Sequence, residues 1–373
     1  MSESYDVIIV GGGYAGLCCG LKLKGKKVLI LEARNEIGRK HRGCQCALYP
    51  FGESFDLEGD DIYFHKNKFR APNVVMMRLS RMELVSSGNR LVATLENPML
   101  LIDEGKIKGT IEYLCKEAGV DIITGAKVRS IETDGQKVSV YADKKYDAKY
   151  LVGADGAHSM VMHYLPLKRR KIGSLLELEV EAERMDVPDD GMYGEMRGIK
   201  VGLYAQPYGE GYMLGVFQGL GMEDKRIDLK KYLEESIKKM KVEGITRRYG
   251  CAIPLHLSAS SSYYKNIVMA GDAVSSFSMT TITGAMMMGL LAGEAVLKKM
   301  EGVESAFEEY SKEWRKILQQ GSMDSLRYFF FLLRRLNEER MGRLFKVLGG
   351  SDLGSVGKGY YIKRIPWIIR AFF

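Results

Sequence analysis

The feature of this sequence that most constrains its fold is a glycine-rich turn near the start of the chain. The turn belongs to a longer unit, whose parts are an apolar strand (residues 5–10), a Gly-x-Gly-x-x-Gly turn (Gly11, Gly13 and Gly16), a helical stretch (17–24) and a second apolar strand (27–31) that ends in Glu32. A strand before the glycines, a helix after them and an acid at the end of the next strand form the context that a dinucleotide-binding motif requires. The alternative is a glycine turn with a purely structural use.

Each residue type in this unit suits contact with a dinucleotide. Gly11 permits the tight turn, Gly13 lets the backbone approach a pyrophosphate at the helix N-terminus, and Gly16 lets the helix pack closely on the sheet. Ala15 lies inside the same turn, so we include it in the predicted cofactor site. Glu32 can accept hydrogen bonds from both ribose hydroxyls. The unit therefore predicts a Rossmann-type nucleotide-binding domain.

Two later segments also read as a strand that runs into a Gly-Asp turn. The first covers residues 150–159 and contains Asp155, and the second covers 266–273 and contains Gly271 and Asp272. Each segment alone is an ordinary strand and turn. In this order after the glycine-rich unit, the segments resemble the FAD-dependent family that contains the aromatic hydroxylases and the geranylgeranyl reductases. The resemblance covers nearly the whole chain.

This resemblance implies that the cofactor is FAD. It places Gly271 and Asp272 on the ribityl chain or the pyrophosphate, and Val128 against the adenine through its backbone. The helix near Gly284 and Ala285 would direct its N-terminus at the flavin ring, where its dipole would stabilise an anionic reduced flavin. The sequence has no second Gly-x-Gly-x-x-Gly unit, so we expect no separate NAD(P)H domain of the glutathione-reductase kind.

Residues 202–212 resemble the substrate strand of the reductases, whose motif is tyrosine-x-tryptophan-x-phenylalanine-proline. Pro207 matches the motif, while Tyr204 and Gln206 stand at the tryptophan and phenylalanine positions. The resemblance implies that Tyr204, Pro207 and Tyr212 bind the substrate. A plain hairpin with aromatic strand faces is the alternative.

A cysteine segment after Glu32 supports the reductase interpretation. Reductases of this group carry a Cys-Ala pair there that touches the flavin, and this chain has Cys44, Cys46 and Ala47. A thiol beside the flavin ring would act as a proton donor or an orienting group, so Cys44, Cys46 and Tyr204 are the candidate catalytic residues. Ordinary buried cysteines are the alternative, because free cysteine packs as a small apolar residue.

Two departures from the family pattern concern charged residues. Hydroxylases usually have an arginine three residues after the serine that follows the Gly-Ala-Asp-Gly turn, and here Met162 takes that place. The missing arginine disfavours a hydroxylase that NADPH reduces directly. It does not affect the interpretation as a reductase that receives electrons from ferredoxin or another donor. The arginine usual before the helix at residues 108–116 is also missing, and Lys106 is the substitute that the sequence offers.

Composition and charge exclude several other classes of protein. The chain has 373 residues, enough for about two domains, and no apolar run approaches the roughly 18 residues of a membrane-spanning helix. Six cysteines, two of them adjacent, fit a reduced cytosolic setting better than a disulfide framework, and none forms a metal-binding cluster with histidine. We expect no signal peptide, because residues 1–6 are polar and the apolar segment behind them ends in glycines rather than a cleavage site.

The net charge of +8 is concentrated at the C-terminus. Residues 326–373 hold ten Lys or Arg and three Asp or Glu, which gives +7. Aromatic residues accompany these cations, a mixture that suits docking on an anionic bilayer surface. A packed helix with a solvated basic face is the alternative. We expect no nucleic-acid partner, because the charge is local and no recognition motif accompanies it.

We therefore expect an α/β protein with a Rossmann-type FAD-binding domain made of discontinuous segments, an α+β substrate domain with a β-sheet, and a helical C-terminal region. The expected boundaries are 1–165 and 251–300 for the FAD-binding domain, 166–250 for the substrate domain and 301–373 for the helical region. The expected location is the cytoplasm, with peripheral attachment to the inner face of the membrane.

The first functional hypothesis is an FAD-dependent reductase of double bonds in a geranylgeranyl or related isoprenoid lipid. It requires an isoprenoid lipid substrate and an external electron donor, either ferredoxin or NAD(P)H. The second hypothesis is a flavin monooxygenase of an aromatic or apolar substrate. The third is a flavin or lipid carrier at the membrane surface that performs no turnover.

Overall fold

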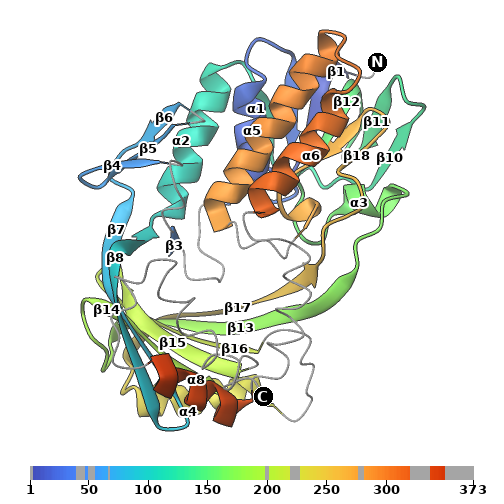
Figure 1. Ribbon diagram of the computed structural model, residues 1–373. Coiled ribbons are helices and arrows are strands. Elements are labelled where there is room, and N and C mark those ends of the chain that lie inside the picture. Colours follow the sequence, from blue (N-terminus) through green and yellow to red (C-terminus); the bar gives the residue numbers. More distant parts are fainter. Residues whose placement is uncertain are drawn as a thin grey trace.

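The computed structural model contains two large sheets, with most of the helices covering the first (Figure 1). It describes residues 3–38, 47–48, 55–65, 68–197, 201–218, 227–275, 281–319 and 337–348. Figure 1 places the first sheet at the top of the molecule and the second below it, with long strands running between them. None of the helices in these ranges is both long and apolar enough to cross a bilayer.

The first sheet has a parallel core formed by the strands that the sequence analysis identified. Its central strand β1 (Glu3–Val10) lies between β12 (Lys145–Gly153) and β2 (Val28–Leu31), parallel to both. Two further parallel strands, β9 (Asp121–Ile123) and β19 (Ile267–Met269), extend the core on either side. All residues of β2 and β19 are buried, as expected for parallel strands covered on both faces. Three antiparallel strands complete the sheet, namely β10 (Ser130–Thr133), β11 (Val138–Tyr141) and β18 (Tyr263–Tyr264).

The helices of this part come from distant parts of the sequence. They are α1 (Tyr14–Lys22), α2 (Glu104–Glu117), the short α3 (Met160–Tyr164), α5 (Thr281–Met300) and α6 (Ala306–Gln319). Figure 1 shows α1, α2, α5 and α6 side by side above the second sheet. This discontinuous Rossmann-type assembly is the fold predicted from the glycine-rich unit and the two later strand–turn segments. The first helix begins three residues earlier than predicted, directly after Gly13.

Close backbone contacts surround α1, and one of them joins α1 to α5. A Cβ atom on Gly289 of α5 would lie 2.0 Å from the carbonyl oxygen of Ala15, and one on Gly16 would lie 1.9 Å from the carbonyl oxygen of Gly11. Both positions therefore require glycine. The contact at Gly16 is the packing role predicted from the motif, whereas the contact at Gly289 was not predicted.

The second sheet is larger than the sequence analysis expected. Its strand order is β17-β13-β16-β15-β14-β7-β8-β3. The strands are β3 (Ala47–Leu48), β7 (Val75–Ser86), β8 (Asn89–Ile102), β13 (Lys171–Arg184), β14 (Gly191–Arg197), β15 (Val201–Tyr208), β16 (Gly211–Gln218) and β17 (Glu243–His256). Residues 75–102, assigned above to the FAD-binding domain, thus pair into the second sheet through the parallel contact of β7 with β14. Such long-range pairing leaves no signal in the local sequence.

Two helices pack on the second sheet. The amphipathic helix α4 (Leu229–Lys239) places Tyr232 and Leu233 against a core formed with residues such as Leu203 and Leu214 of the sheet. The C-terminal helix α8 (Glu338–Leu348) contacts β7, β8 and β14. Figure 1 shows both helices on the side of the sheet away from the first part. A helical region was expected over residues 301–373, of which the structure describes 301–319 and 337–348.

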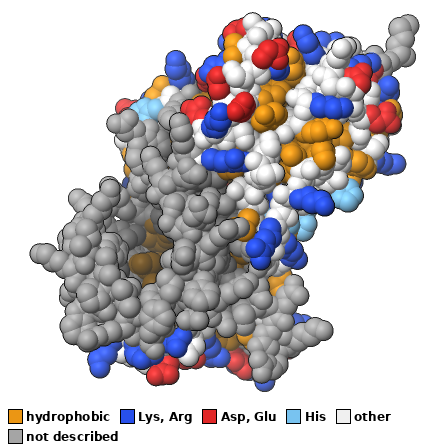
Figure 2. All heavy atoms as spheres, turned by 45° about the vertical axis from the view of Figure 1, so that its right-hand side comes forward, with side chains coloured by type: hydrophobic (Ala, Val, Ile, Leu, Met, Phe, Trp, Pro, Cys, Tyr) orange, Lys and Arg blue, Asp and Glu red, His pale blue; other side chains and the backbone are white. Residues whose placement is uncertain are grey.

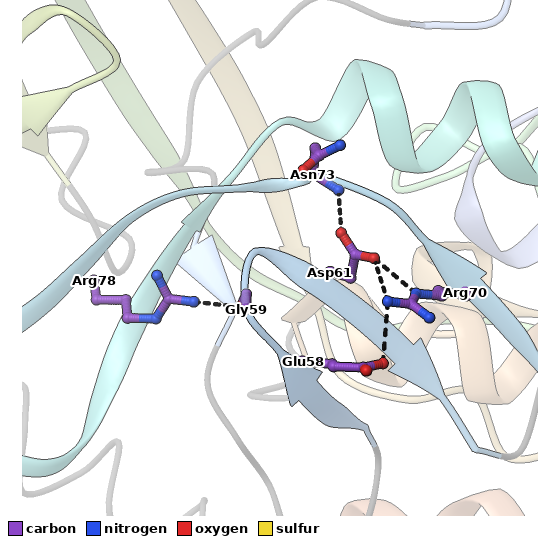
Figure 3. A network of polar contacts seen from close by, with 6 residues as sticks. All are labelled: Glu58, Gly59, Asp61, Arg70, Asn73 and Arg78. Atoms are coloured by element: carbon purple, nitrogen blue, oxygen red, sulfur yellow. Dashed lines mark hydrogen bonds and ion pairs between the residues drawn. The ribbon is translucent and has the colours of Figure 1, made fainter.

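A small three-stranded sheet lies beside α2 (Figure 1) and consists of β4 (Asp56–Glu58), β5 (Asp61–Phe64) and β6 (Phe69–Ala71). Figure 3 shows the polar network that fastens it. Asp61 accepts hydrogen bonds from Arg70 Nε and the Asn73 backbone N–H, both at 2.7 Å, and Glu58 pairs with Arg70 at 3.0 Å. Because these groups are largely exposed, their role is to fix the hairpin rather than to contribute much stability.

The contact between α1 and α5 leads to a test by single substitution. Replacing Gly289 with alanine should destabilise the protein by roughly 1–3 kcal/mol, because the new methyl group would overlap backbone atoms that cannot move independently. The matched control is Gly109→Ala in α2, where a Cβ atom would meet nothing within 4 Å. This second change should stabilise the protein by roughly 0.5–1 kcal/mol through helix propensity. Denaturant unfolding of both variants measures the difference, and equal effects would contradict the close contact.

Candidate functional site

A cavity of about 460 Å³ opens at the carboxyl ends of the central parallel strands. Ligands of open parallel sheets bind at this edge, where the strand order changes direction. The cavity is lined by Val10, Gly11, Gly12, Gly13, Leu31, Glu32, Ala33, Arg34, Gly38, Lys108, Ala126, Val128, Ala154, Asp155, Gly156, Ala157 and His158. Five predicted cofactor residues, Gly11, Gly13, Glu32, Val128 and Asp155, therefore meet around one space.

The glycine-rich turn is shaped to bring backbone close to a ligand. Gly11 has a φ of +106°, and a Cβ atom there would lie 2.4 Å from the Ala154 carbonyl oxygen. Gly13 is the N-cap of α1, and a Cβ atom on it would meet nothing within 4 Å. The first N–H groups of α1 thus face open space that suits a pyrophosphate, which the helix dipole favours.

Glu32 is held in place by backbone donors. Its two carboxylate oxygens accept hydrogen bonds from the Gly12 N–H at 2.7 Å and from the Arg34 N–H at 2.9 Å. Each carboxylate oxygen accepts more than one hydrogen bond, so this fixed group can also receive ribose hydroxyls. The backbone of Glu32 also accepts a hydrogen bond from the N–H of Ala126, which brings the Val128 segment to the same wall of the cavity.

Lys108 is a cavity residue that the sequence analysis missed. It lies in α2, with its Nζ atom 2.5 Å from Glu104 and 4.7 Å from the centre of the Tyr14 ring. Lys106, the substitute proposed from the sequence, bonds instead to the Asn73 carbonyl oxygen at 3.0 Å and does not line the cavity. Asp103 caps α2 by accepting a hydrogen bond from the Lys106 N–H, and two residues further along this helix Lys108 lines the cavity.

Asp155 shapes the site by holding the turn around it. One carboxylate oxygen accepts from Ser159 Oγ at 2.5 Å, and the other accepts from the backbone N–H groups of Met160 and Val161 at 2.6 and 3.1 Å. Burial raises the pKa of Asp155, while these hydrogen bonds oppose the shift. Because its oxygens cap α3, the contribution of Asp155 to a cofactor is chiefly positional.

Gly271 and Asp272 lie in a short 3-10 turn, η2 (Gly271–Ala273), that follows β19. Gly271 has a φ of +62°, and a Cβ atom on it would lie 3.0 Å from the Cβ of Ala15. This contact brings the predicted cofactor residues Ala15 and Gly271 together beside α5, whose first five residues include Gly284 and Ala285. Desolvation raises the pKa of Asp272, and the charge of Arg169 lowers it.

Arg169 is a second functional residue that the sequence analysis missed. Its guanidinium donates to the carbonyl oxygens of Asp272, at 2.8 Å, and Ala157, at 3.1 Å. It therefore ties the two Gly-Asp turns to each other at the connection that leads into the second sheet. Figure 2 shows cationic and histidine side chains gathered between the two parts, and the exposed cationic and histidine residues of this connection are His158, His163, Lys168, Arg170 and Lys171.

Unlike five of the predicted cofactor residues, the predicted catalytic and substrate residues that the structure describes do not line the cavity. Cys44 and Cys46 lie outside the described residues, and Ala47 pairs with Leu101 in the second sheet. Tyr204 is buried on one face of that sheet. Tyr212 packs toward α4 on the opposite face and donates a hydrogen bond to Asp189, and Pro207, which is paired with Tyr212, shares that face by strand alternation. The three expected substrate residues thus do not share one surface.

Comparisons with known proteins identify the cofactor. Residues 6–45 and 92–219 each match a family described as an FAD binding domain. Digeranylgeranylglycerophospholipid reductase of Methanocaldococcus jannaschii is 27% identical, over 98% of this chain and 95% of that protein. Geranylgeranyl diphosphate reductase of Rhodobacter capsulatus is 22% identical over 72% and 68%. Among solved structures, a geranylgeranyl bacteriochlorophyll reductase-like protein of Thermoplasma acidophilum superposes with a TM-score of 0.79 at 19% identity, covering 99% and 98% of the two chains.

The residues around the cavity fit FAD. The open space at Gly13, the fixed carboxylate of Glu32 and the Lys108 ammonium suit a pyrophosphate, a ribose and a negative charge, respectively. Together with the two family matches, this geometry confirms the prediction that the chain is an FAD-binding protein.

The position of Lys108 leads to a second test. Lys108→Met should weaken FAD binding about tenfold, because it removes one cation from the cavity while keeping an unbranched side chain one atom shorter. Lys106→Met is the matched control and should leave FAD affinity unchanged, since its Nζ atom bonds elsewhere. Equilibrium dialysis of the apoprotein with FAD measures both. A larger loss for Lys106→Met would restore the assignment made from the sequence.

Proposed function

We propose that this chain, which belongs to the geranylgeranyl reductase family of FAD-dependent proteins, reduces carbon–carbon double bonds of a geranylgeranyl or related isoprenoid chain in lipid biosynthesis. The observation that carries the proposal is that one continuous chain combines the FAD cavity with a second sheet and aligns from end to end with a digeranylgeranylglycerophospholipid reductase. A free-standing FAD-binding domain would lack the second sheet.

The chemistry explains why such an enzyme needs two parts. An isolated alkene accepts hydride poorly because no carbonyl group stabilises the developing charge, so a proton must reach one carbon as hydride reaches the other. Reduced FAD supplies the hydride. The protein must hold the alkene at contact distance, exclude water and position a proton donor.

The proton donor is proposed from three residues that the sequence analysis selected. Cys44 and Cys46 follow the strand that ends in Glu32, and Tyr204 lies on the second sheet. The support for Tyr204 is that its hydroxyl is buried and bonded to Glu179, so its orientation is fixed. Substituting each residue in turn and comparing reduction rates at saturating flavin distinguishes among them.

Electrons are proposed to come from an external donor, either ferredoxin or NAD(P)H. The support is that Met162 stands where the hydroxylases have an arginine, and that the chain has no second Gly-x-Gly-x-x-Gly unit. Stopped-flow reduction of the bound flavin by each donor separates the two choices.

The proposed location is the cytoplasm, at the inner face of the membrane. Its support is the charge of +7 in residues 326–373 together with the aromatic residues of the same segment. Deleting residues 363–373 should reduce co-sedimentation with anionic liposomes and leave binding to neutral liposomes unchanged. Unchanged co-sedimentation with anionic liposomes would contradict the proposal.

The decisive test of the activity is an anaerobic reaction. The purified protein with FAD, reduced by dithionite, should convert a geranylgeranyl glycerolipid to products whose masses rise in steps of two hydrogens. The same preparation without protein is the control. An unchanged lipid, with the reduced flavin reoxidising only after air is admitted, would favour a monooxygenase or a carrier.

A further inference from the structure

The second sheet has a face turned away from α4 that carries an unusual set of buried polar groups. We call it the inner face. Strand alternation places Leu203 and Ala205 in the core under α4, so Tyr204 and Gln206 point to the other side. The register places Glu177 and Glu179 of β13 and Cys251 of β17 on this same inner face.

The polar groups of the inner face contact one another. The Tyr204 hydroxyl donates a hydrogen bond to Glu179, and Glu177 lies near the same hydroxyl. Cys251 Sγ lies 3.7 Å from a carboxylate oxygen of Glu177. Burial, followed by the two glutamates, raises the pKa of Tyr204 well above its usual range, so the phenol stays protonated. A Cβ atom on Gly215 would lie 2.3 Å from the Tyr204 ring, so the facing strand is shaped to admit this side chain.

Gln206 adds the observation that indicates a ligand. Its side chain is fully buried, yet within the described part of the chain neither Oε1 nor Nε2 has a hydrogen-bond partner. A buried amide without partners costs free energy, and folded proteins rarely leave both of its polar atoms unsatisfied. The amide therefore needs a group that both donates and accepts a hydrogen bond.

An apolar strip adjoins this polar set. Leu79, Met99 and Leu101 form a buried cluster, and Met77, Met192 and Tyr208 pack against it. Tyr208 is two residues beyond Gln206 on the same strand, and Met213 is paired with Gln206 across β16. Methionine adapts to irregular apolar shapes. The inner face thus offers a polar end and a flexible apolar end to one ligand.

The polar end selects among the groups that an isoprenoid lipid can carry. Carboxylates accept hydrogen bonds, and they repel a phosphate or a diphosphate placed beside them. A hydroxyl has one donor and can also accept, so a single hydroxyl satisfies the Gln206 amide by donating to Oε1 and accepting from Nε2. A neutral alcohol therefore matches the inner face better than an anionic head group.

We propose that the inner face binds a hydroxyl-bearing isoprenoid, with its hydroxyl hydrogen-bonded to the Gln206 amide and its chain along the apolar strip. This inference rests on the proposed function and specifies its substrate class. The hydroxyl can belong to a free isoprenoid alcohol or to the glycerol of an unphosphorylated ether lipid, and both present the same group to the amide.

The test compares substrates that differ only at the hydroxyl. Reduction by the complete FAD-loaded protein is measured with geranylgeraniol, its methyl ether and geranylgeranyl diphosphate, and with digeranylgeranylglycerol and its methyl ether. One alcohol should exceed its own ether in kcat/KM by about tenfold, because one hydrogen-bond donor is lost. Geranylgeraniol should also exceed the diphosphate. The alcohol–ether pair that shows the difference identifies the source of the hydroxyl.

Two variants localise the effect to Gln206. Gln206→Met keeps the length of the side chain and removes the amide, so it should abolish the alcohol–ether difference and raise the melting temperature of the ligand-free protein. Met192→Leu, in the apolar strip, should change the kcat/KM of an alcohol and its ether by the same factor and leave their ratio intact.

The outcomes separate two failures. If no isoprenoid is reduced, the proposed function fails. If isoprenoids are reduced but no alcohol is preferred over its ether, the proposed function stands and the hydroxyl site is wrong. A Gln206→Met variant that melts at a lower temperature and keeps the preference would also overturn the inference, because the amide would then serve the fold alone.

Discussion

The cofactor site depends on a set of backbone-to-backbone contacts around the first helix. The carbonyl oxygen of Gly11 lies against Gly16, the Ala154 carbonyl against Gly11, and the Ala15 carbonyl against Gly289. No side chain fits between these surfaces, so the N-terminus of α1 is held by atoms that cannot change rotamer. A helix terminus can stabilise a pyrophosphate only where its free N–H groups are kept in a fixed position. The long-range contact with Gly289 is thus as much a part of the nucleotide site as the local motif.

This dependence explains why the sequence predicted some of the site and not the rest. The turn at Gly11 and the acid at Glu32 are linked by a short segment with strong local preferences, so spacing alone placed them together. Arg169 and Lys108 act from other parts of the chain. Arg169 lies in the connection between α3 and β13, which joins the first sheet to the second, and Lys108 lies one turn inside α2. Neither feature produces a periodic pattern in the amino-acid sequence that would reveal it.

The second sheet shows the same difficulty of predicting contacts between distant parts of the sequence. Residues 202–212 were interpreted as a substrate strand, with a plain hairpin as the alternative, and the structure pairs them as the strands β15 and β16. The joining of β7 to β14 was not predicted, because parallel pairing between residues 75–86 and 191–197 depends on a contact more than a hundred residues apart. The assignment of faces also needed the structure. Only the packing of α4 shows that Tyr212 and Tyr204 point in opposite directions.

The two faces of the second sheet explain where the departures from the reductase motif lie. Tyr204 and Gln206 replace two large aromatic residues, and both replacements lie on the inner face, whereas the matching Pro207 lies under α4. Substitution has therefore changed the chemistry of one face and preserved the support of the other. Glu177 and Glu179 on the neighbouring strand supply carboxylates to the same face. Apolar packing tolerates many chain shapes, whereas an unsatisfied amide accepts few groups, so the proposed hydroxyl site would narrow the set of ligands that this face recognises.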